Sequence, residues 1–311
     1  MLSTLIGGFK EYHLLVVRFG ASFIFLLSIL WKPFPFHKKF IPRFLFLSLL
    51  WSSPMLLVWS HQWPTPKETR PSPNGIALVS FNGRYLDGLP YAACEALQTA
   101  QPDLLMVQEA TTAMVDTLEV SFGSQLPFRL LHPHPKYGMA TYSQYPIQLD
   151  TAICAPGINK SWHYVQIFQV CPPEGASFRI VHVRLPSASA IFTSKQGWLR
   201  QMNYQQHIRQ IYWDLITEVL RKLPPLPTWY LGDFNTYPGS PLYYSLLDTH
   251  MDAVAGSPYF FQGTLGTKLS WMPPLFRVDW AFGPPESQVS DFRHLSVPNS
   301  DHKAIAFSLL N

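Results

Sequence analysis

The sequence predicts an α/β fold: a four-layered sandwich of two packed, mostly antiparallel or mixed sheets flanked by helices, preceded by one or two N-terminal transmembrane helices. Three observations support this prediction. Strand-like segments outnumber helix-like ones in residues 75–311, and several follow one another closely enough to pair locally, which favours packed sheets over a doubly wound parallel sheet. The longest uncharged apolar runs all precede residue 61. Polar side chains repeatedly follow the apolar strands.

Residues 1–60 are typical of a membrane anchor. The runs 14–31 and 44–60 carry a single charge between them, Arg18, and each approaches the roughly 20 apolar residues that span a bilayer. The segment 32–43 between them holds four Lys or Arg and no acid, so we expect it on the cytoplasmic side. The domain that follows would then be membrane-anchored and lie on the extracytoplasmic side.

Other arrangements of this anchor also fit the sequence. Both runs could cross the membrane as a hairpin, or only 44–60 could cross while 14–31 lies at the interface. Two buried helices of a soluble domain would usually show a polar face, and a cleaved signal peptide would need a clear small-residue site after the run. Residues 61–74 contain four prolines and predict a stiff linker, so we place the catalytic domain at 75–311.

Within this domain, short apolar or alternating runs bounded by turn residues predict strands. We expect strands at 76–81, 104–107, 138–142, 147–153, 163–170, 178–185, 228–231, 278–282 and 304–310. Helical spacing of apolar residues predicts two helices. The first covers 89–100 and ends before Pro102, and the second covers 196–223 and ends before Pro224.

Charge and cysteine content exclude several classes of protein. The chain holds 23 Lys and Arg against 19 Asp and Glu, but residues 75–311 hold 15 against 17, so the basic excess belongs to the N-terminal segment. The domain has no long basic stretch that could follow a nucleic-acid backbone. Three cysteines form neither a disulfide framework nor a zinc motif. They are best explained as small buried side chains, although a Cys154–Cys171 bridge stays open in an oxidising compartment.

Two of the predicted strands end in residues that suit a hard cation. Asn82 follows the strand 76–81, and Glu109 comes just after the strand 104–107. A carboxylate at the edge of a sheet suits a ligand of Mg²⁺ or Mn²⁺. Taken alone, Asn82 could be an ordinary turn residue, and Glu109 could be a capping or surface acid.

The segment Gly232-Asp233-Phe234-Asn235 follows the strand 228–231. Gly232 would let the backbone approach a ligand closely. In extended backbone Asp233 and Asn235 would point to the same face, where one could act as a base and the other could donate to a phosphate oxygen. The alternative is a simple turn, which Asp and Asn also favour.

A further acidic group lies close to the end of the sequence. Asp301 is a natural ligand of a hard cation, and His302 could bind a phosphate or transfer a proton near neutral pH. Asp279 lies within an apolar run, where a buried acid needs a partner. We expect His302 to be that partner, because a carboxylate orients a histidine ring in this way. The alternative partner is Arg277.

Read together, these residues resemble the endonuclease/exonuclease/phosphatase superfamily, the fold of pancreatic-type deoxyribonuclease, and predict a membrane-anchored, bacterial-type member. The resemblance extends from about Ile76 to Leu310. The matching segments are Ser80–Asn82, Pro102–Glu109, Gly138–Ser143 with Tyr145-Pro146, Gly232–Asn235 with Pro238 and Ser240, Arg277–Asp279 and Ser300–His302.

The resemblance implies a role for each residue of the set. Asn82, Glu109 and Asp301 would surround Mg²⁺ or Mn²⁺. Asp233 and Asn235 would position or activate the attacking water and bind the phosphate. His302, oriented by Asp279, would contact the scissile phosphate.

One position departs from the family's pattern. The family usually carries a His in a mid-chain Asn-x-His-Leu strand, where this chain has His182-Val183-Arg184-Leu185. Arg184 therefore occupies the expected His position, and His182 points the same way two residues earlier. Arg184 could bind a phosphate through two hydrogen bonds but could not donate a proton. Either His182 takes the role, or the contact is purely electrostatic, or activity is reduced.

The sequence thus predicts a divalent-metal-dependent phosphoesterase that hydrolyses a phosphodiester or phosphomonoester by in-line attack of water. A nucleic acid is one candidate substrate, and the predicted anchor favours a phospholipid or its headgroup as another. A catalytically weak protein that binds a phosphorylated ligand is the alternative from a different class. The complete set of Glu109, Asp233, Asn235, Asp301 and His302 favours the enzyme. No obligate protein partner is indicated.

Overall fold

The computed structural model describes residues 75–84, 89–134, 138–154, 164–187, 198–238, 240–255, 257, 259, 262–266, 274 and 276–310. The predicted anchor (1–60) and linker (61–74) lie outside the described residues. Within the described ranges, no helix has both the length and the apolar character needed to cross a membrane.

Two six-stranded mixed sheets form the inner layers of the domain. The first contains, in sheet order, β11 (Gln288–Ser296), β12 (Lys303–Leu310), β1 (Gly75–Asn82), β2 (Leu104–Gln108), β4 (Met139–Ser143) and β3 (Phe128–His132). The second contains β5 (Ile147–Cys154), β6 (Tyr164–Val170), β7 (Phe178–Arg184), β8 (Thr228–Asp233), β10 (Asp279–Gly283) and β9 (Met251–Asp252). Among the described strands, β1 pairs with β2 and β7 pairs with β8 in parallel, and the other neighbours are antiparallel.

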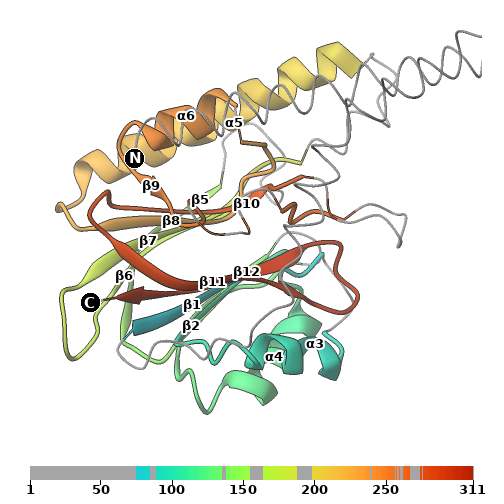
Figure 1. The fold of residues 1–311 in the computed structure, drawn as a ribbon, viewed down its shortest axis with the longest axis vertical. Coiled ribbons are helices and arrows are strands. Elements are labelled where there is room, and N and C mark those ends of the chain that lie inside the picture. Colours follow the sequence, from blue (N-terminus) through green and yellow to red (C-terminus); the bar gives the residue numbers. More distant parts are fainter. Residues whose placement is uncertain are drawn as a thin grey trace, which may run out of the picture. The chain divides into compact units, whose positions relative to one another are not determined.

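Helices cover the outer face of each sheet (Figure 1). The helices α3 (Tyr91–Gln98) and α4 (Thr112–Phe122) pack against the first sheet, and α5 (Trp198–Lys222) and α6 (Pro241–Leu247) lie over the second. The four layers confirm the predicted α/β sandwich of two mixed sheets flanked by helices.

The sequence of β1 shows why the sheets stack in this way. Val79 and Phe81 pack with the buried side chains of α3 and α4, whereas Ile76 and Leu78 pack with those of the second sheet. Because successive residues of a strand point to opposite faces, a strand buried on both faces must be apolar throughout. Full burial of such a side chain contributes roughly 1.5–3 kcal/mol.

The cysteines remain unpaired, which rules out the disulfide left open above. Cys94, Cys154 and Cys171 are all free. Cys154 pairs in register with Tyr164 at one end of the β5–β6 ladder, whereas Cys171 follows Val170 at the other end. The two thiols are separated by the length of this hairpin, so they cannot form a bond.

Gly232 sets how closely β8 approaches β7. A Cβ atom at this position would lie 2.0 Å from the carbonyl oxygen of Val183, and the backbone has φ of +135°. The close approach therefore involves the neighbouring strand, not a ligand as expected from the sequence. The glycine is required because no larger residue fits between these two strands.

Replacing Gly232 with Ala should destabilise the domain by about 3 kcal/mol or more, because the methyl group overlaps a backbone oxygen and the φ value is unfavourable. Urea denaturation of the wild type and the variant would measure this difference. Val120→Ala is a suitable control, since Val120 is exposed on α4 and does not touch the packing between β7 and β8. A loss below about 1 kcal/mol for Gly232→Ala would contradict the tight packing of β7 and β8.

Candidate active site

The candidate site lies where strand ends from both sheets meet. In the first sheet, Asn82 pairs in register with Gln108 at the ends of β1 and β2. In the second sheet, Asp233 ends β8 between Arg184 of β7 and Asp279 of β10. The parallel pairing within each sheet therefore brings two strand ends to the same edge, which is why residues far apart in the sequence converge here.

Asn82 connects the two sheets. Its Nδ2 donates to Asp233 Oδ2 at 2.9 Å and to Glu109 Oε1 at 3.3 Å, and its side chain is buried. Its Oδ1 accepts the backbone N–H of Arg84 at 2.9 Å. Asn82 therefore fixes the relative positions of two carboxylates that come from different sheets.

The turn after β8 holds the carboxylate of Asp233 in place. Asn235 donates its backbone N–H to Asp233 Oδ1 at 2.8 Å and its Nδ2 to Asp233 Oδ2 at 2.6 Å. Its Nδ2 also donates to the carbonyl of Leu185 at 2.8 Å, and its φ is +49°. The extended backbone assumed from the sequence is thus wrong here, because the segment forms an Asx turn. This turn makes Asn235 a positioning residue for Asp233.

The segment Ser300-Asp301-His302 is hydrogen-bonded to the end of β1. Ser300 Oγ donates to the carbonyl of Asn82 at 2.8 Å and accepts the backbone N–H of His302 at 3.0 Å. Asp301 Oδ2 lies 3.4 Å from Arg84 Nε in a partly exposed ion pair. These contacts bring Asp301 and His302 next to Asn82.

His302 and Asp279 form the predicted hydrogen bond, with Nδ1 and Oδ2 at 2.9 Å. The alternative partner, Arg277, instead pairs with Asp252 at 2.7 Å. Thr264, which the sequence did not single out, aligns the pair. Its Oγ1 accepts the N–H of Asp279 at 3.1 Å, and its carbonyl accepts the N–H of Lys303 at 2.7 Å.

Electrostatics separate the roles of Asp233 and His302. Burial raises the pKa of Asp233 to about 7, with Asp279 and Glu109 acting in the same direction and with His302 and Arg184 opposing it. Burial lowers the pKa of His302, but the charge of Asp279 outweighs it and raises the pKa to about 10. At neutral pH, Asp233 can therefore accept a proton, while His302 is a cation that donates hydrogen bonds.

Arg184 contacts a predicted metal ligand. Its Nη2 and Nε donate to Glu109 Oε1 at 2.6 and 3.2 Å, and both side chains are buried. Glu109 has φ of +57°, a left-handed conformation that costs a non-glycine residue about 1–2 kcal/mol. In this conformation the Glu109 carboxylate accepts hydrogen bonds from Arg184 and Asn82.

His182 lies apart from these groups. Its Nε2 accepts from Gln108 Nε2 at 2.6 Å, its Nδ1 lies 3.2 Å from Gln166 Oε1, and the ring is fully buried. Burial lowers its pKa to about 3, so the ring is neutral at physiological pH. The structure therefore gives His182 a role in the contact between the sheets and leaves it without access to a substrate.

We expect His182→Leu to destabilise the domain by roughly 2–4 kcal/mol, because Gln108 and Gln166 would lose buried hydrogen-bond partners. At a temperature where the variant remains folded, kcat should fall by less than about threefold. Thermal unfolding and steady-state kinetics would test this. A loss in kcat above about a hundredfold with little change in stability would instead assign His182 to proton transfer.

Arg209 of α5 is a second residue that the sequence did not single out. Its Nε donates to the carbonyl of Pro186 at 3.1 Å, and Pro186 follows Leu185, whose carbonyl holds Asn235. Arg209 thus stabilises the backbone next to the turn that contains Asp233. In the sequence, Arg209 is simply a basic residue on an amphipathic helix, and such residues are usually exposed to solvent.

Two of the residues predicted to hold a metal ion are carboxylates close to Asn82. Glu109 accepts a hydrogen bond from Asn82, and Asp301 follows Ser300, which bonds to the carbonyl of Asn82; carboxylate oxygens are the ligands that hard divalent cations prefer. Asp301 Oδ1 is buried and lacks a hydrogen-bond partner among the described residues, so this oxygen is available to a cation. Ligand atoms of Asp233, Asp279 and His302 also lie within 4.8 Å of one another, although His302 Nδ1 already bonds to Asp279.

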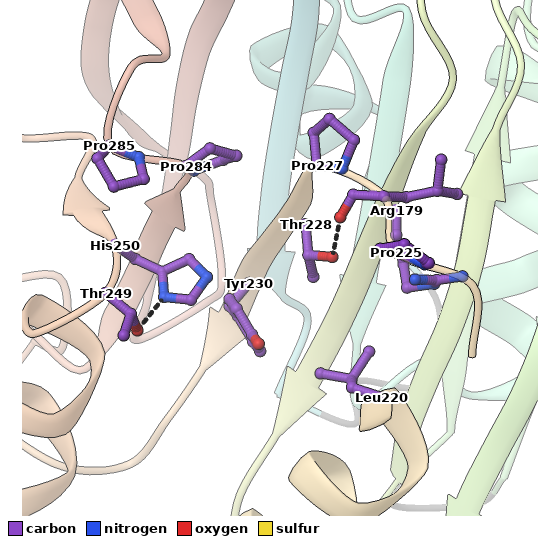
Figure 2. Close-up of a pocket in the computed structure, with 11 residues that line it drawn as sticks. Arg179, Leu220, Pro225, Pro227, Thr228, Tyr230, Thr249, His250, Pro284 and Pro285 are labelled. Carbon is purple, nitrogen blue, oxygen red and sulfur yellow. Dashed lines mark hydrogen bonds between the residues drawn. The ribbon is translucent and has the colours of Figure 1, made fainter. Parts of the chain in front are cut away.

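A pocket of about 290 Å³ lies away from this site (Figure 2). It lies beside Arg179 and Thr228, which pair at the start of β7 and β8, whereas Arg184 and Asp233 pair at the far end. Its walls include four prolines with Tyr230 and His250. None of the predicted site residues lines it, so the pocket is separate from the group of carboxylates.

Several solved structures share this fold. The fold is similar to that of Caenorhabditis elegans TDP2, at 17% identity and a TM-score of 0.56, over 76% of this chain and 98% of the other. D. rerio TDP2 in complex with a single-strand DNA product gives 16% identity and a TM-score of 0.57, over 76% and 99%. An endonuclease/exonuclease/phosphatase from Beutenbergia cavernae gives 13% and 0.53, over 76% and 72%. No curated protein matches significantly in sequence.

Residues 79–302 match the model of the endonuclease/exonuclease/phosphatase family, so the chain belongs to this family. The match includes the residues from β1 to His302 on which the resemblance was based. The protein is accordingly a metal-dependent hydrolase of phosphoesters.

Proposed function

We propose that residues 75–311 hydrolyse a phosphodiester by in-line attack of a water molecule that Asp233 activates. The observation that carries this proposal is the position of the Asp233 carboxylate. It is buried, has a pKa of about 7, and lies between Asn82, Asn235 and the Asp279–His302 pair. A base with a pKa near the working pH is best suited to proton transfer.

The other residues have complementary roles in this proposal. Glu109, Asp301 and Asn82 hold Mg²⁺ or Mn²⁺, which when bound neutralises charge that develops on the phosphate. His302, kept cationic by Asp279, donates a hydrogen bond to a phosphate oxygen. Asn82 and Asn235 hold Asp233 in the orientation needed to accept a proton from water.

We propose a nucleic acid as the first candidate substrate. Support comes from the similarity in fold to D. rerio TDP2, whose structure contains a single-strand DNA product. The domain carries 15 basic and 17 acidic side chains, so we expect it to act on a nucleic-acid end or a short single strand rather than to follow a long duplex.

A phospholipid or its headgroup is the second candidate, and the apolar N-terminal runs favour it. We propose that residues 1–60 anchor the chain in a membrane, with the domain on the extracytoplasmic side. An anchored hydrolase would meet substrates at the bilayer surface. Extraction of the full-length protein from membranes by detergent, but not by high salt, would test the anchor.

The activity is tested by incubating the full-length protein with Mg²⁺ or Mn²⁺ and single-stranded DNA, RNA, sphingomyelin or inositol phosphates in parallel. We expect turnover of at least one substrate, and loss of that turnover when EDTA removes the metal. Binding of metal and phosphate without hydrolysis of any substrate would favour the weak phosphate-binding protein instead.

A further inference from the structure

The buried ion pair of Arg184 and Glu109 lies within the proposed metal site. The guanidinium donates twice to a single carboxylate oxygen, Glu109 Oε1, which also accepts from Asn82. The two side chains are only 4% and 8% exposed. Charge-assisted hydrogen bonds of this kind are about twice as strong as neutral ones, so the pair is a well-defined state of the metal-free protein.

The same carboxylate is a proposed ligand of the divalent cation. A guanidinium cannot lose its proton in a protein, so Arg184 keeps its positive charge in every state of the site. At low effective dielectric, a fixed charge and a divalent cation that share one carboxylate repel each other strongly. Arg184 and the cation therefore compete for Glu109.

The phosphoryl group of a bound substrate would offer the guanidinium of Arg184 a second acceptor when it leaves Glu109. Asn82 Nδ2 donates both to Glu109 Oε1, the acceptor of Arg184, and to Asp233, the proposed base. The guanidinium therefore lies close to the place where the phosphate must be attacked. A tetrahedral phosphoryl group offers paired oxygens that match the geometry of a guanidinium. A substrate bound there would stabilise Arg184 away from Glu109.

We propose that Arg184 exchanges partners: it binds Glu109 in the metal-free protein, and it leaves Glu109 for the substrate's phosphoryl oxygens when a divalent cation binds. The inference rests on the proposed function and goes beyond it, because it makes cation binding and anion binding depend on each other. Linkage requires the effect to be reciprocal: an anion on Arg184 tightens the cation, and the cation tightens the anion by the same factor.

The experiment measures Mn²⁺ binding to the full-length protein directly, from the EPR signal of free Mn²⁺, with and without saturating sulfate as a tetrahedral dianion. We expect sulfate to tighten Mn²⁺ binding to the wild type by about fivefold or more. Arg184→Gln should bind Mn²⁺ about tenfold more tightly without sulfate, because it removes the competing charge, and sulfate should then have no effect. Arg184→Lys keeps the positive charge, so it should still compete with Mn²⁺ for Glu109 almost as well as the wild type does.

Arg179→Gln is the matched control, because Arg179 lies on the same strand and forms a buried ion pair with Asp150 at 2.8 Å at the opposite end. It should bind Mn²⁺ like the wild type. Unchanged or weaker Mn²⁺ binding by Arg184→Gln would overturn the exchange. If that variant fails to fold, an absence of any sulfate effect on the wild type overturns it equally. No Mn²⁺ binding by the wild type would overturn the proposed metal site as well.

Discussion

Replacing Asp233 with Asn should lower kcat by about 10²–10⁴-fold while the domain remains folded. Asn has nearly the same shape as Asp but cannot accept a proton from water. The fold should tolerate it because the pKa of Asp233 is about 7, so the native protein already contains the neutral form near physiological pH. The measurement is kcat on the substrate identified with Mg²⁺ or Mn²⁺, together with thermal unfolding.

Asp116→Asn provides the control for this substitution, because Asp116 is exposed on α4 and contacts none of the site residues in the described structure. It should retain wild-type kcat. If Asp233→Asn kept more than about a tenth of the wild-type kcat, Asp233 would not be the base, and water activation would have to be assigned elsewhere.

The second large effect is expected for Asp279→Asn. In the wild type, the charge of Asp279 overcomes the effect of burial and keeps His302 protonated up to a pKa of about 10. Without this charge, burial still lowers the pKa of His302, and only the smaller effects of Asp233 and Asp301 raise it, so the pKa should fall well below 10. A much smaller fraction of His302 would then be cationic at pH 8, so kcat at that pH should fall severalfold or more.

The pH dependence of kcat measures this change. The alkaline limb of kcat should move from near pH 10 in the wild type to a clearly lower pH in Asp279→Asn. The stability of the fold should depend on the protonation of His302 as well. The folded state binds the His302 proton more tightly than the unfolded chain does, so the His302–Asp279 pair stabilises the fold fully below pH 6.5. This stabilisation disappears as the pH rises through about 10. An alkaline limb that stays in place would show that His302 is not required as a cation.

Most inner strands were predictable because they are buried on both faces. The segments 76–81 and 104–107 appear as β1 and β2 because their apolar runs are continuous. The strand β11 was not predicted, since its residues are half-buried and a register shift between Ser290 and Arg293 breaks the alternation. Helix α4 was also missed, although Thr111 caps it and Met114 and Leu118 carry a readable helical spacing.

The members of the site were easier to predict than the bonds between them. Strand-end positions identified Asn82, Glu109 and Asp233 because strand ends within a sheet gather at its edge. The sequence also placed His182 and Arg184 correctly on one face of β7, where both reach residues at the end of β2. It could not tell which one meets the site, because this depends on how the second sheet is offset against the first. Only the structure shows that Arg184 pairs with Glu109.

The bond between Ser300 and Asn82 joins residues that are 218 positions apart. A ribosome that adds roughly 5–20 residues per second needs about 10–40 s to make that stretch. During this interval the growing chain has β1 but lacks the neighbouring strand β12 and the two residues, Asp301 and His302, to which we assign metal and phosphate binding. On that assignment, the nascent chain stays inactive beside the RNA and ribosome that produce it until the last residues of its site have been synthesised.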